Sequence, residues 1–187
     1  MDVYLVPIGA DRYESYFEAA DDEDDPEPVQ GQGVFARLRA NFSAQLREAD
    51  IPLASLIRPA GDVPALFRAL RAAGVPAAVV TTDHRRETEE TLQLLGVAGL
   101  VDYLLCGDDG VTPKPAPDML LHTCRQMGVE PVRAAMVGDT LGDLIMAERA
   151  GAGLRVGVLT GAGTREVLAP HADVVLASVD EIRVAAS

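Results

Sequence analysis

Residues 134–153 read AAMVGDTLGDLIMAERAGAG, and this stretch contains two expected elements of secondary structure joined by a polar turn. The apolar run from Ala134 to Val137 predicts a short buried strand. Residues Leu141 to Ala150 predict a helix, and Gly151 marks its end because glycine readily adopts the left-handed conformation that closes helices. A buried strand followed at once by a helix is the repeating unit of α/β proteins.

The alternation of strands and helices extends to both sides of this stretch, so we assign residues 51–187 to one core. Expected strands lie at 77–80, 103–105, 134–137, 156–159 and 174–176, and expected helices at 62–73, 85–95, 117–127, 141–150 and 164–168. Strands that alternate with helices through short loops pair in parallel. We therefore predict a doubly wound, Rossmann-like α/β fold, with a parallel sheet and helices on both faces.

Residues 1–50 differ in character and are predicted to form a divergent N-terminal segment. Residues 21–33 begin with an acidic, proline-punctuated run, which repels itself and predicts a solvated linker. Residues 34–49 carry apolar side chains at helical spacing and predict one amphipathic helix. Two interpretations of this helix stay open: it covers the sheet, or it docks a partner helix or a second copy of the chain.

The composition limits the classes of partner. The chain has 187 residues and a formal net charge of -13, which argues against nucleic acid and anionic membranes because phosphate groups attract Lys and Arg. No apolar stretch reaches the roughly 18 residues of a membrane helix, and no secretory signal is found. The two cysteines, Cys106 and Cys124, have neither disulfide-framework nor metal-site spacing. We expect a reduced, cytoplasmic setting.

Two groups of polar side chains lie where ligands bind in α/β sheets, beyond the carboxyl ends of strands. Thr81 and Thr82 follow strand 77–80 directly, and a hydroxyl there either donates to an anion or caps the next helix. Lys114 is the only lysine of the chain and begins the sequence Lys-Pro-Ala-Pro, whose prolines stiffen the entry to a helix. Its compact ammonium either neutralises phosphate oxygens or is an exposed charge.

A third group consists of Asp139 and Asp143, which follow strand 134–137 about one helical turn apart. Two carboxylates so close repel each other unless a cation lies nearby. Mg²⁺ prefers oxygen ligands, keeps several waters and binds substrate phosphate. We therefore predict that Asp139 and Asp143 bind Mg²⁺; in the alternative, Asp139 caps the helix and Asp143 is solvated.

The three groups, taken in this order, resemble the haloacid dehalogenase-like hydrolase superfamily, and within it the phosphoglycolate-phosphatase-like branch. The resemblance covers roughly residues 55–180. It implies that Thr81, Thr82 and Lys114 bind phosphate, that Thr81 and Lys114 act in catalysis, and that many members carry asparagine where this chain has Thr82. It also implies that Asp139 is a Mg²⁺ ligand and that Asp143 coordinates or orients the metal shell. The implied reaction is Mg²⁺-dependent hydrolysis of a small phosphorylated metabolite through an aspartyl-phosphate.

The family's first motif, Asp-x-Asp after the first strand, is not found. The best placement puts Pro7 at the nucleophile position and Gly9 at the acid-base position, and neither side chain can do this chemistry. The resemblance places that first strand at the centre of the sheet, between strands 77–80 and 134–137, where proline is rarely accepted. Three other acidic residues precede the core without a convincing buried strand before them: Asp11, Asp21 and Asp22.

Three functions stay open on this reasoning. The first is a phosphatase-type hydrolase with an unrecognised carboxylate, the second an inactive relative that still binds a phosphorylated metabolite, and the third an interaction module that uses residues 34–49. The interval that usually holds the family's cap domain contains the acidic linker and one helix, so we expect a minimal or absent cap. We expect a small phosphorylated molecule as ligand, and a monomer or homodimer.

Overall fold

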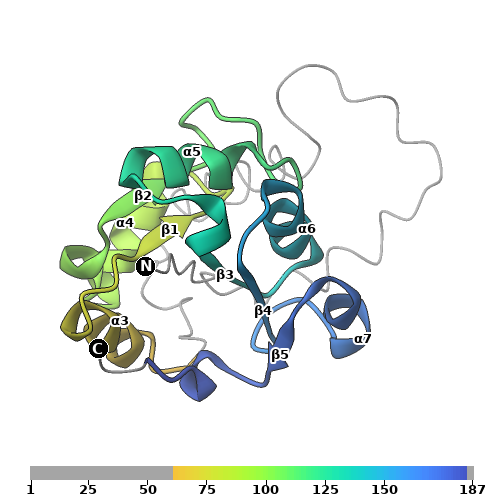
Figure 1. Ribbon diagram of the computed structural model, residues 1–187. Coiled ribbons are helices and arrows are strands. Elements are labelled where there is room, and N and C mark those ends of the chain that lie inside the picture. Colours follow the sequence, from red (N-terminus) through yellow and green to blue (C-terminus); the bar gives the residue numbers. More distant parts are fainter. Residues whose placement is uncertain (1–60, 185–187) are drawn as a thin grey trace, which may run out of the picture.

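The computed structural model describes residues 61–184 (Figure 1). Several predictions lie outside these residues: the linker at 21–33, the helix at 34–49, the boundary near residue 50 and the placement of the first motif at Pro7 and Gly9. None of the helices described here is long and apolar enough to cross a membrane.

Strands and helices alternate along the described chain, as predicted. The strands are β1 (Ala78–Val80), β2 (Tyr103–Leu105), β3 (Ala135–Gly138), β4 (Leu154–Val158) and β5 (Val174–Leu176). The α-helices are α3 (Val63–Ala72), α4 (Arg85–Leu94), α5 (Asp118–Met127), α6 (Leu141–Ala150) and α7 (Arg165–Leu168). Short 3₁₀ turns fill several of the connections. The molecule is therefore an α/β protein.

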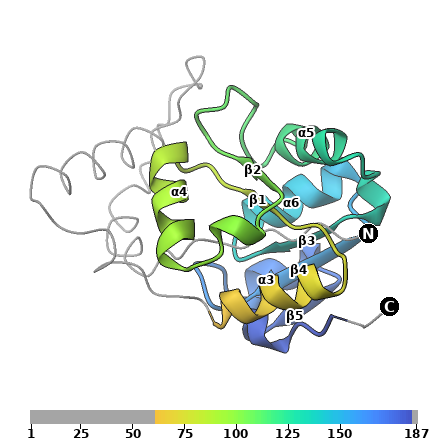
Figure 2. The same cartoon turned by 90° about the vertical axis from the view of Figure 1, so that its left-hand side faces the viewer.

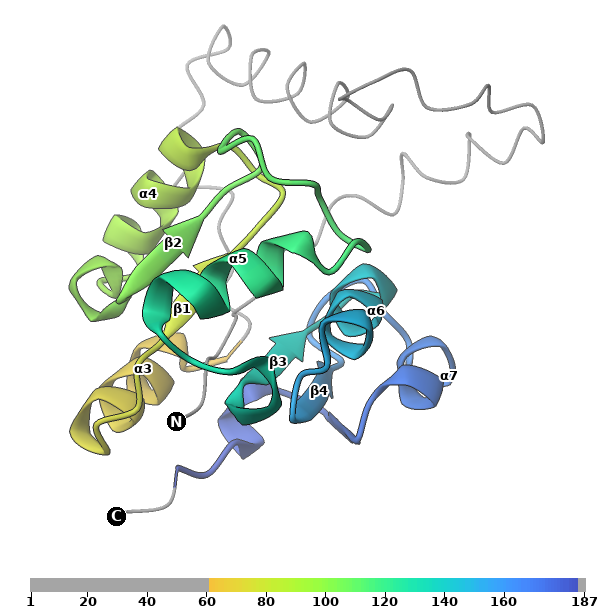
Figure 3. The ribbon, with the colours of Figure 1, turned by 45° about the horizontal axis from the view of Figure 1, so that its top comes forward.

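The strands pair in parallel, but within residues 61–184 they form two sheets and not the single sheet that we predicted (Figure 3). Strand β1 pairs with β2, and β4 lies between β3 and β5. The prediction of parallel pairing is confirmed, whereas continuity of the sheet is not seen among these strands. The break falls between β1 and β3, which is the position that the resemblance gives to the family's first strand.

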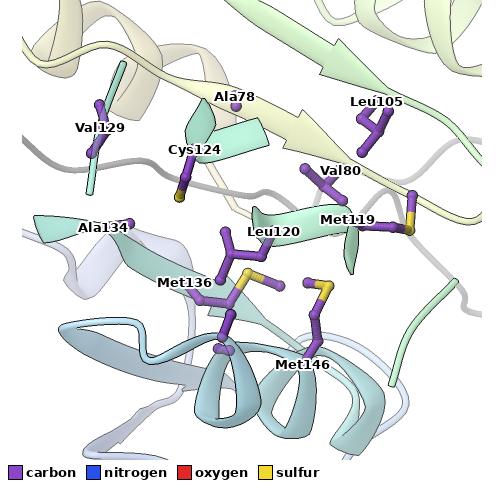
Figure 4. Packing of buried hydrophobic residues seen from close by; sticks show 12 residues of the cluster. Ala78, Val80, Leu105, Met119, Leu120, Cys124, Val129, Ala134, Met136 and Met146 are labelled. Carbon is purple, nitrogen blue, oxygen red and sulfur yellow. The ribbon is translucent and has the colours of Figure 1, made fainter. Parts of the chain in front are cut away.

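The two sheets share the same layers of helices on their two faces (Figure 2). One core cluster joins α5 and α6 to both sheets: Ala78, Val80, Leu105, Met119, Leu120, Cys124, Met136, Met146 and Ala147 (Figure 4). A second cluster joins α3 and α4 to both sheets: Val63, Leu66, Phe67, Leu70, Val79, Leu92, Val137, Val156 and Val158. Alternate residues of a strand face opposite layers, so helices on both faces bury β1 and β3 completely, whereas β5 at the sheet edge stays partly exposed.

Local signals set most helix ends. Asp62 caps α3 through a hydrogen bond from the Ala65 amide to its carboxylate, 2.9 Å long. Gly128 and Gly151 close α5 and α6 in the left-handed conformation, as their positions predicted. Strand β4 begins two residues before its predicted start, because Leu154 pairs with β3 although its side chain is exposed. The charged residue Arg155 interrupts the apolar run after Leu154, so the expected strand began only at Val156.

Candidate active site

Lys114 connects the carboxyl ends of the two sheets. Its Nζ atom donates a hydrogen bond to the carbonyl oxygen of Val80, the last residue of β1, over 3.4 Å. The same Nζ atom forms an ion pair with Asp143 in the first turn of α6, just beyond β3. The lysine side chain is only 17% exposed. One ammonium thus holds together two loops that are far apart in sequence, as the strand-end rule led us to expect.

Asp143 is held on both of its carboxylate oxygens. Oδ1 contacts Lys114, while Oδ2 accepts hydrogen bonds from the Thr140 hydroxyl (2.7 Å) and the Thr140 amide (3.1 Å). Thr140 is the N-cap of α6 and forms a capping box with Asp143. The alternative in which Asp139 caps this helix and Asp143 is solvated is therefore wrong, because Thr140 is the cap and Asp143 is 3% exposed.

Asp139 lies directly after β3 and is 6% exposed. Its Oδ2 atom accepts a hydrogen bond of 3.1 Å from the amide of Ala162, and its carbonyl oxygen accepts one of 2.9 Å from Gly163. Burial raises the pKa of Asp139, the negative charge of Asp143 raises it further, and the Ala162 amide and Lys114 oppose the rise. The charged form of Asp139 is thus disfavoured, first by burial and then by the neighbouring carboxylate.

The loop after β4 fits closely around Asp139. A Cβ atom added at Gly161 would lie 1.8 Å from Asp139 Oδ2, and one added at Gly163 would lie 2.4 Å from the Asp139 carbonyl oxygen. Both positions therefore require glycine for the backbone to approach so near. Sequence reasoning missed this loop, although the pattern Gly-Ala-Gly after an expected strand was a usable signal.

Two carboxylates fit a Mg²⁺ site, although they do not complete one. In the part of the chain from 61 to 184, no group of three or more His, Cys, Asp or Glu side chains is arranged to hold a metal. Mg²⁺ is commonly held by one or two carboxylates, with waters and substrate phosphate as its other ligands. Asp139 meets this minimum, and Asp143 would join it by giving up a bond to Lys114 or Thr140. A cation beside Asp139 would oppose the burial and the Asp143 charge that raise its pKa.

The hydroxyl of Thr81 makes its observed hydrogen bonds within its own loop. Thr81 Oγ1 donates to Asp83 Oδ2 over 2.9 Å and accepts from the Asp83 amide over 3.1 Å. Thr81 is buried and directly follows Val80, whose carbonyl Lys114 contacts. The structure therefore brings Lys114 and Asp143 into contact, with Asp139 within electrostatic reach of both. Thr81 follows Val80 directly, and its hydroxyl is bound to Asp83. Thr82 is half-buried in the same loop.

With this geometry in place, comparison with known proteins identifies the family. Residues 6–151 match the family model of the haloacid dehalogenase-like hydrolases, and the chain belongs to this family. A phosphoglycolate phosphatase from Neisseria meningitidis is 34% identical over 134 residues, which cover 70% of this chain and 57% of that protein. An N-acetylmuramic acid 6-phosphate phosphatase from Pseudomonas aeruginosa is 36% identical over 114 residues, which cover 61% of this chain and 49% of that protein.

Solved structures support the same fold. A putative β-phosphoglucomutase from Thermotoga maritima superimposes with a TM-score of 0.71 at 19% identity, covering 94% of both chains. The predicted membership of this superfamily is thus confirmed. The chain spans about half the length of the curated relatives it matches.

Proposed function

We propose that this protein is a phosphatase-type hydrolase that binds a small phosphorylated metabolite together with Mg²⁺ at the carboxyl ends of β1 and β3. The observation that carries the proposal is the contact of Lys114 with both Val80 and Asp143. This contact joins the Lys-Pro turn and the Gly-Asp turn, the two sequence features that the family uses for phosphate and metal. The names of the phosphatase relatives add support for a phosphorylated metabolite such as phosphoglycolate.

Each residue contributes a distinct part of the binding chemistry. Lys114 supplies the positive charge that a phosphate dianion needs, at a place where burial strengthens charge interactions. Asp139 and Asp143 supply oxygen ligands for Mg²⁺, which when bound neutralises charge on the phosphate oxygens. Thr81 donates to the phosphate once its hydroxyl turns from Asp83, and Thr82 lines the same loop.

A second function, binding without hydrolysis, is favoured by one observation. Within residues 61–184 no third acidic side chain joins Asp139 and Asp143 in a metal-binding group. Cys106 cannot replace the nucleophile, because burial raises its pKa to about 11 and leaves the thiol protonated at neutral pH. Binding by Lys114, Asp139 and Asp143 needs no such nucleophile.

Hydrolysis of p-nitrophenyl phosphate and of phosphoglycolate with and without Mg²⁺ separates the two functions. The hydrolase is supported by Mg²⁺-dependent turnover that Asp139→Asn abolishes. Turnover that survives in Asp139→Asn would come from a contaminant or another site and would refute the proposal. Arg155→Gln, which changes a charged residue away from this site, serves as the control.

Thermal denaturation with orthovanadate tests binding in the same preparations. A Mg²⁺-dependent rise of the melting temperature, without turnover, would establish the inactive binding protein instead. If the protein shows neither turnover nor stabilisation, both functions are excluded, and the interaction module that uses residues 34–49 is left.

We further propose a minimal cap and a cytoplasmic monomer or homodimer. Support for the small cap comes from the sequence, because the interval that usually holds the cap contains the acidic linker and one expected helix. The two cysteines, Cys106 and Cys124, are free and buried, in keeping with a reducing compartment. With little cap to select the leaving group, several small phosphomonoesters should be hydrolysed at rates within about tenfold of one another. A strong preference for one substrate, measured as kcat/KM, would contradict the small cap.

A further inference from the structure

Arg85 and Asp109 form a two-pronged ion pair beside the candidate site. Arg85 Nη2 lies 2.6 Å from Asp109 Oδ2, and Arg85 Nε donates to Asp109 Oδ1 over 3.1 Å. Arg85 begins α4, directly after the loop that carries Thr81 and Thr82. Asp109 lies in the turn after β2, which leads to Lys114. The pair therefore links the two loops that the proposed function assigns to phosphate.

Each partner of this pair also binds the backbone at the end of β2. Arg85 Nη2 donates to the carbonyl oxygen of Leu104 over 3.1 Å, and the amide of Cys106 donates to Asp109 Oδ2 over 2.8 Å. These bonds hold the guanidinium group of Arg85 at the end of β2. A planar fork with two parallel hydrogen bonds restricts both position and orientation, which a single point charge does not.

Three other contacts join the same two loops. The Gly107 amide donates to the carbonyl oxygen of Asp83 over 2.9 Å, and the Arg85 amide donates to Asp108 Oδ1 over 2.9 Å. A Cβ atom added at Gly107 would lie 2.2 Å from the carbonyl oxygen of Thr82. The loops are thus in direct contact, and a shift of one must move the other.

A second arginine–aspartate pair of the same geometry lies at the opposite ends of the strands. Arg155 Nη2 and Nε donate to Asp173 over 2.8 and 3.1 Å, and the Arg155 amide donates to the same carboxylate over 2.8 Å. Side chains are 39% and 24% exposed in the Arg85–Asp109 pair, and 25% and 39% exposed in the Arg155–Asp173 pair. The second pair is a matched control, because it joins β4 to the start of β5, away from Lys114.

We propose that Arg85 and Asp109 are positioning residues, which hold the Thr81 loop and the Lys114 loop in the arrangement that binds phosphate. The identity of the ligand rests on the proposed function, whereas the contact between the two loops does not depend on that function. Partly exposed ion pairs contribute little to global stability. A merely structural role therefore predicts equal, small effects at both pairs, whereas a positioning role predicts an effect on Lys114 at one pair only.

The single lysine of the chain provides a direct probe of the link. The rate of acetylation of Lys114 by an amine-reactive ester, followed by mass spectrometry, reports how firmly its ammonium is held. We expect Asp109→Asn to accelerate this reaction, by roughly tenfold if the effect matches the loss of groups that orient metal ligands. Asp173→Asn should leave the rate unchanged. Equal rates in Asp109→Asn and Asp173→Asn would overturn the proposal.

Arg85→Gln and Arg155→Gln repeat the comparison from the other side of each pair, which keeps the test decisive if Asp109→Asn fails to fold. Arg85→Gln is expected to behave as Asp109→Asn does, and a rate equal to that of Arg155→Gln would again overturn the proposal. Calorimetric titration with orthophosphate and Mg²⁺ then adds a functional readout. Roughly tenfold weaker binding is expected in Asp109→Asn, with a melting temperature close to that of Asp173→Asn. Absence of binding in the native protein counts against the proposed function, while the acetylation rates still decide the positioning role.

Discussion

The charged side chains in the loops at the carboxyl ends of the two sheets are paired in different ways. Beyond β1 and β2, the carboxylate of Asp109 is paired with Arg85 and a backbone amide. Beyond β3, Asp143 is paired with Lys114, whereas burial and then the charge of Asp143 raise the pKa of Asp139. The first arrangement holds loops in place, whereas the second leaves a carboxylate whose charged form a bound cation would favour. Carboxylates with a shifted pKa are typical of binding sites.

The largest effect is expected at Lys114, which both regions share. Lys114→Met should abolish Mg²⁺-dependent phosphate binding and lower the free energy of unfolding by about 3 kcal/mol, because Asp143 is left buried without its cation. Urea denaturation measures the second effect. Combining Lys114→Met with Asp143→Leu should recover part of the lost stability, since the unpaired charge is gone. A double variant less stable than Asp143→Leu alone by the full loss of about 3 kcal/mol would show that the loss in Lys114→Met does not come from an unpaired Asp143.

The next effect concerns the loop that encloses Asp139. Gly161→Ala should lower the free energy of unfolding by about 2 kcal/mol and weaken Mg²⁺ binding, because the added methyl group overlaps Asp139 Oδ2. Gly99→Ala is the matched control, since no atom lies within 4 Å of a Cβ atom at Gly99. Thermal denaturation and Mg²⁺ titration of both variants measure these effects. Equal stability and equal Mg²⁺ affinity in the two variants would mean that the loop shifts to accommodate the methyl group.

A smaller effect of opposite sign is expected at Asp139 itself. A raised pKa means that the folded state prefers the protonated carboxyl, so stability falls as pH rises through that pKa. Asp139→Asn should therefore raise the free energy of unfolding by about 1 kcal/mol at pH 7 without Mg²⁺. The gain should vanish below the ordinary carboxyl pKa near 4, where both states are protonated. A variant that is less stable than the native protein at pH 7 would contradict the raised pKa of Asp139.

The smallest effect is expected at the control pair. Hydrogen bonds from Arg155 lower the pKa of Asp173, so its contribution is present above the ordinary pKa and disappears as pH falls through the lowered value. Asp173→Asn should cost less than about 1 kcal/mol at pH 7, because the pair is partly exposed. Denaturation at pH 7 and near pH 2 measures both ends of this window. A larger loss of stability in Asp173→Asn near pH 2 than at pH 7 would contradict this prediction.

Local sequence signals predicted the elements of secondary structure and one contact of the candidate site, that between Lys114 and Asp143. Helix α6 has its predicted bounds, because Val137, Gly138 and Gly151 mark a strand end and a helix stop. The contact between Lys114 and Asp143 followed from the rule that parallel strand ends meet at one edge.

Other features depend on pairing between distant or competing groups, which a local pattern does not encode. Thr81 binds Asp83, two residues away, because short-range hydrogen bonds compete with any ligand contact. The Arg85–Asp109 pair joins residues 24 positions apart, and β1 and β3 belong to separate sheets. Neither the apolar periodicity of strands nor the spacing of acidic residues contains information on such pairing.

The most direct test is calorimetric titration of orthophosphate into the native protein and into Asp139→Asn, each with and without Mg²⁺. If Lys114, Asp139 and Asp143 form one phosphate-and-metal site, the native protein binds phosphate only when Mg²⁺ is present, and Asp139→Asn loses this dependence and most of the affinity. Phosphate binding that is equally strong without Mg²⁺, or unchanged in Asp139→Asn, would contradict a shared site.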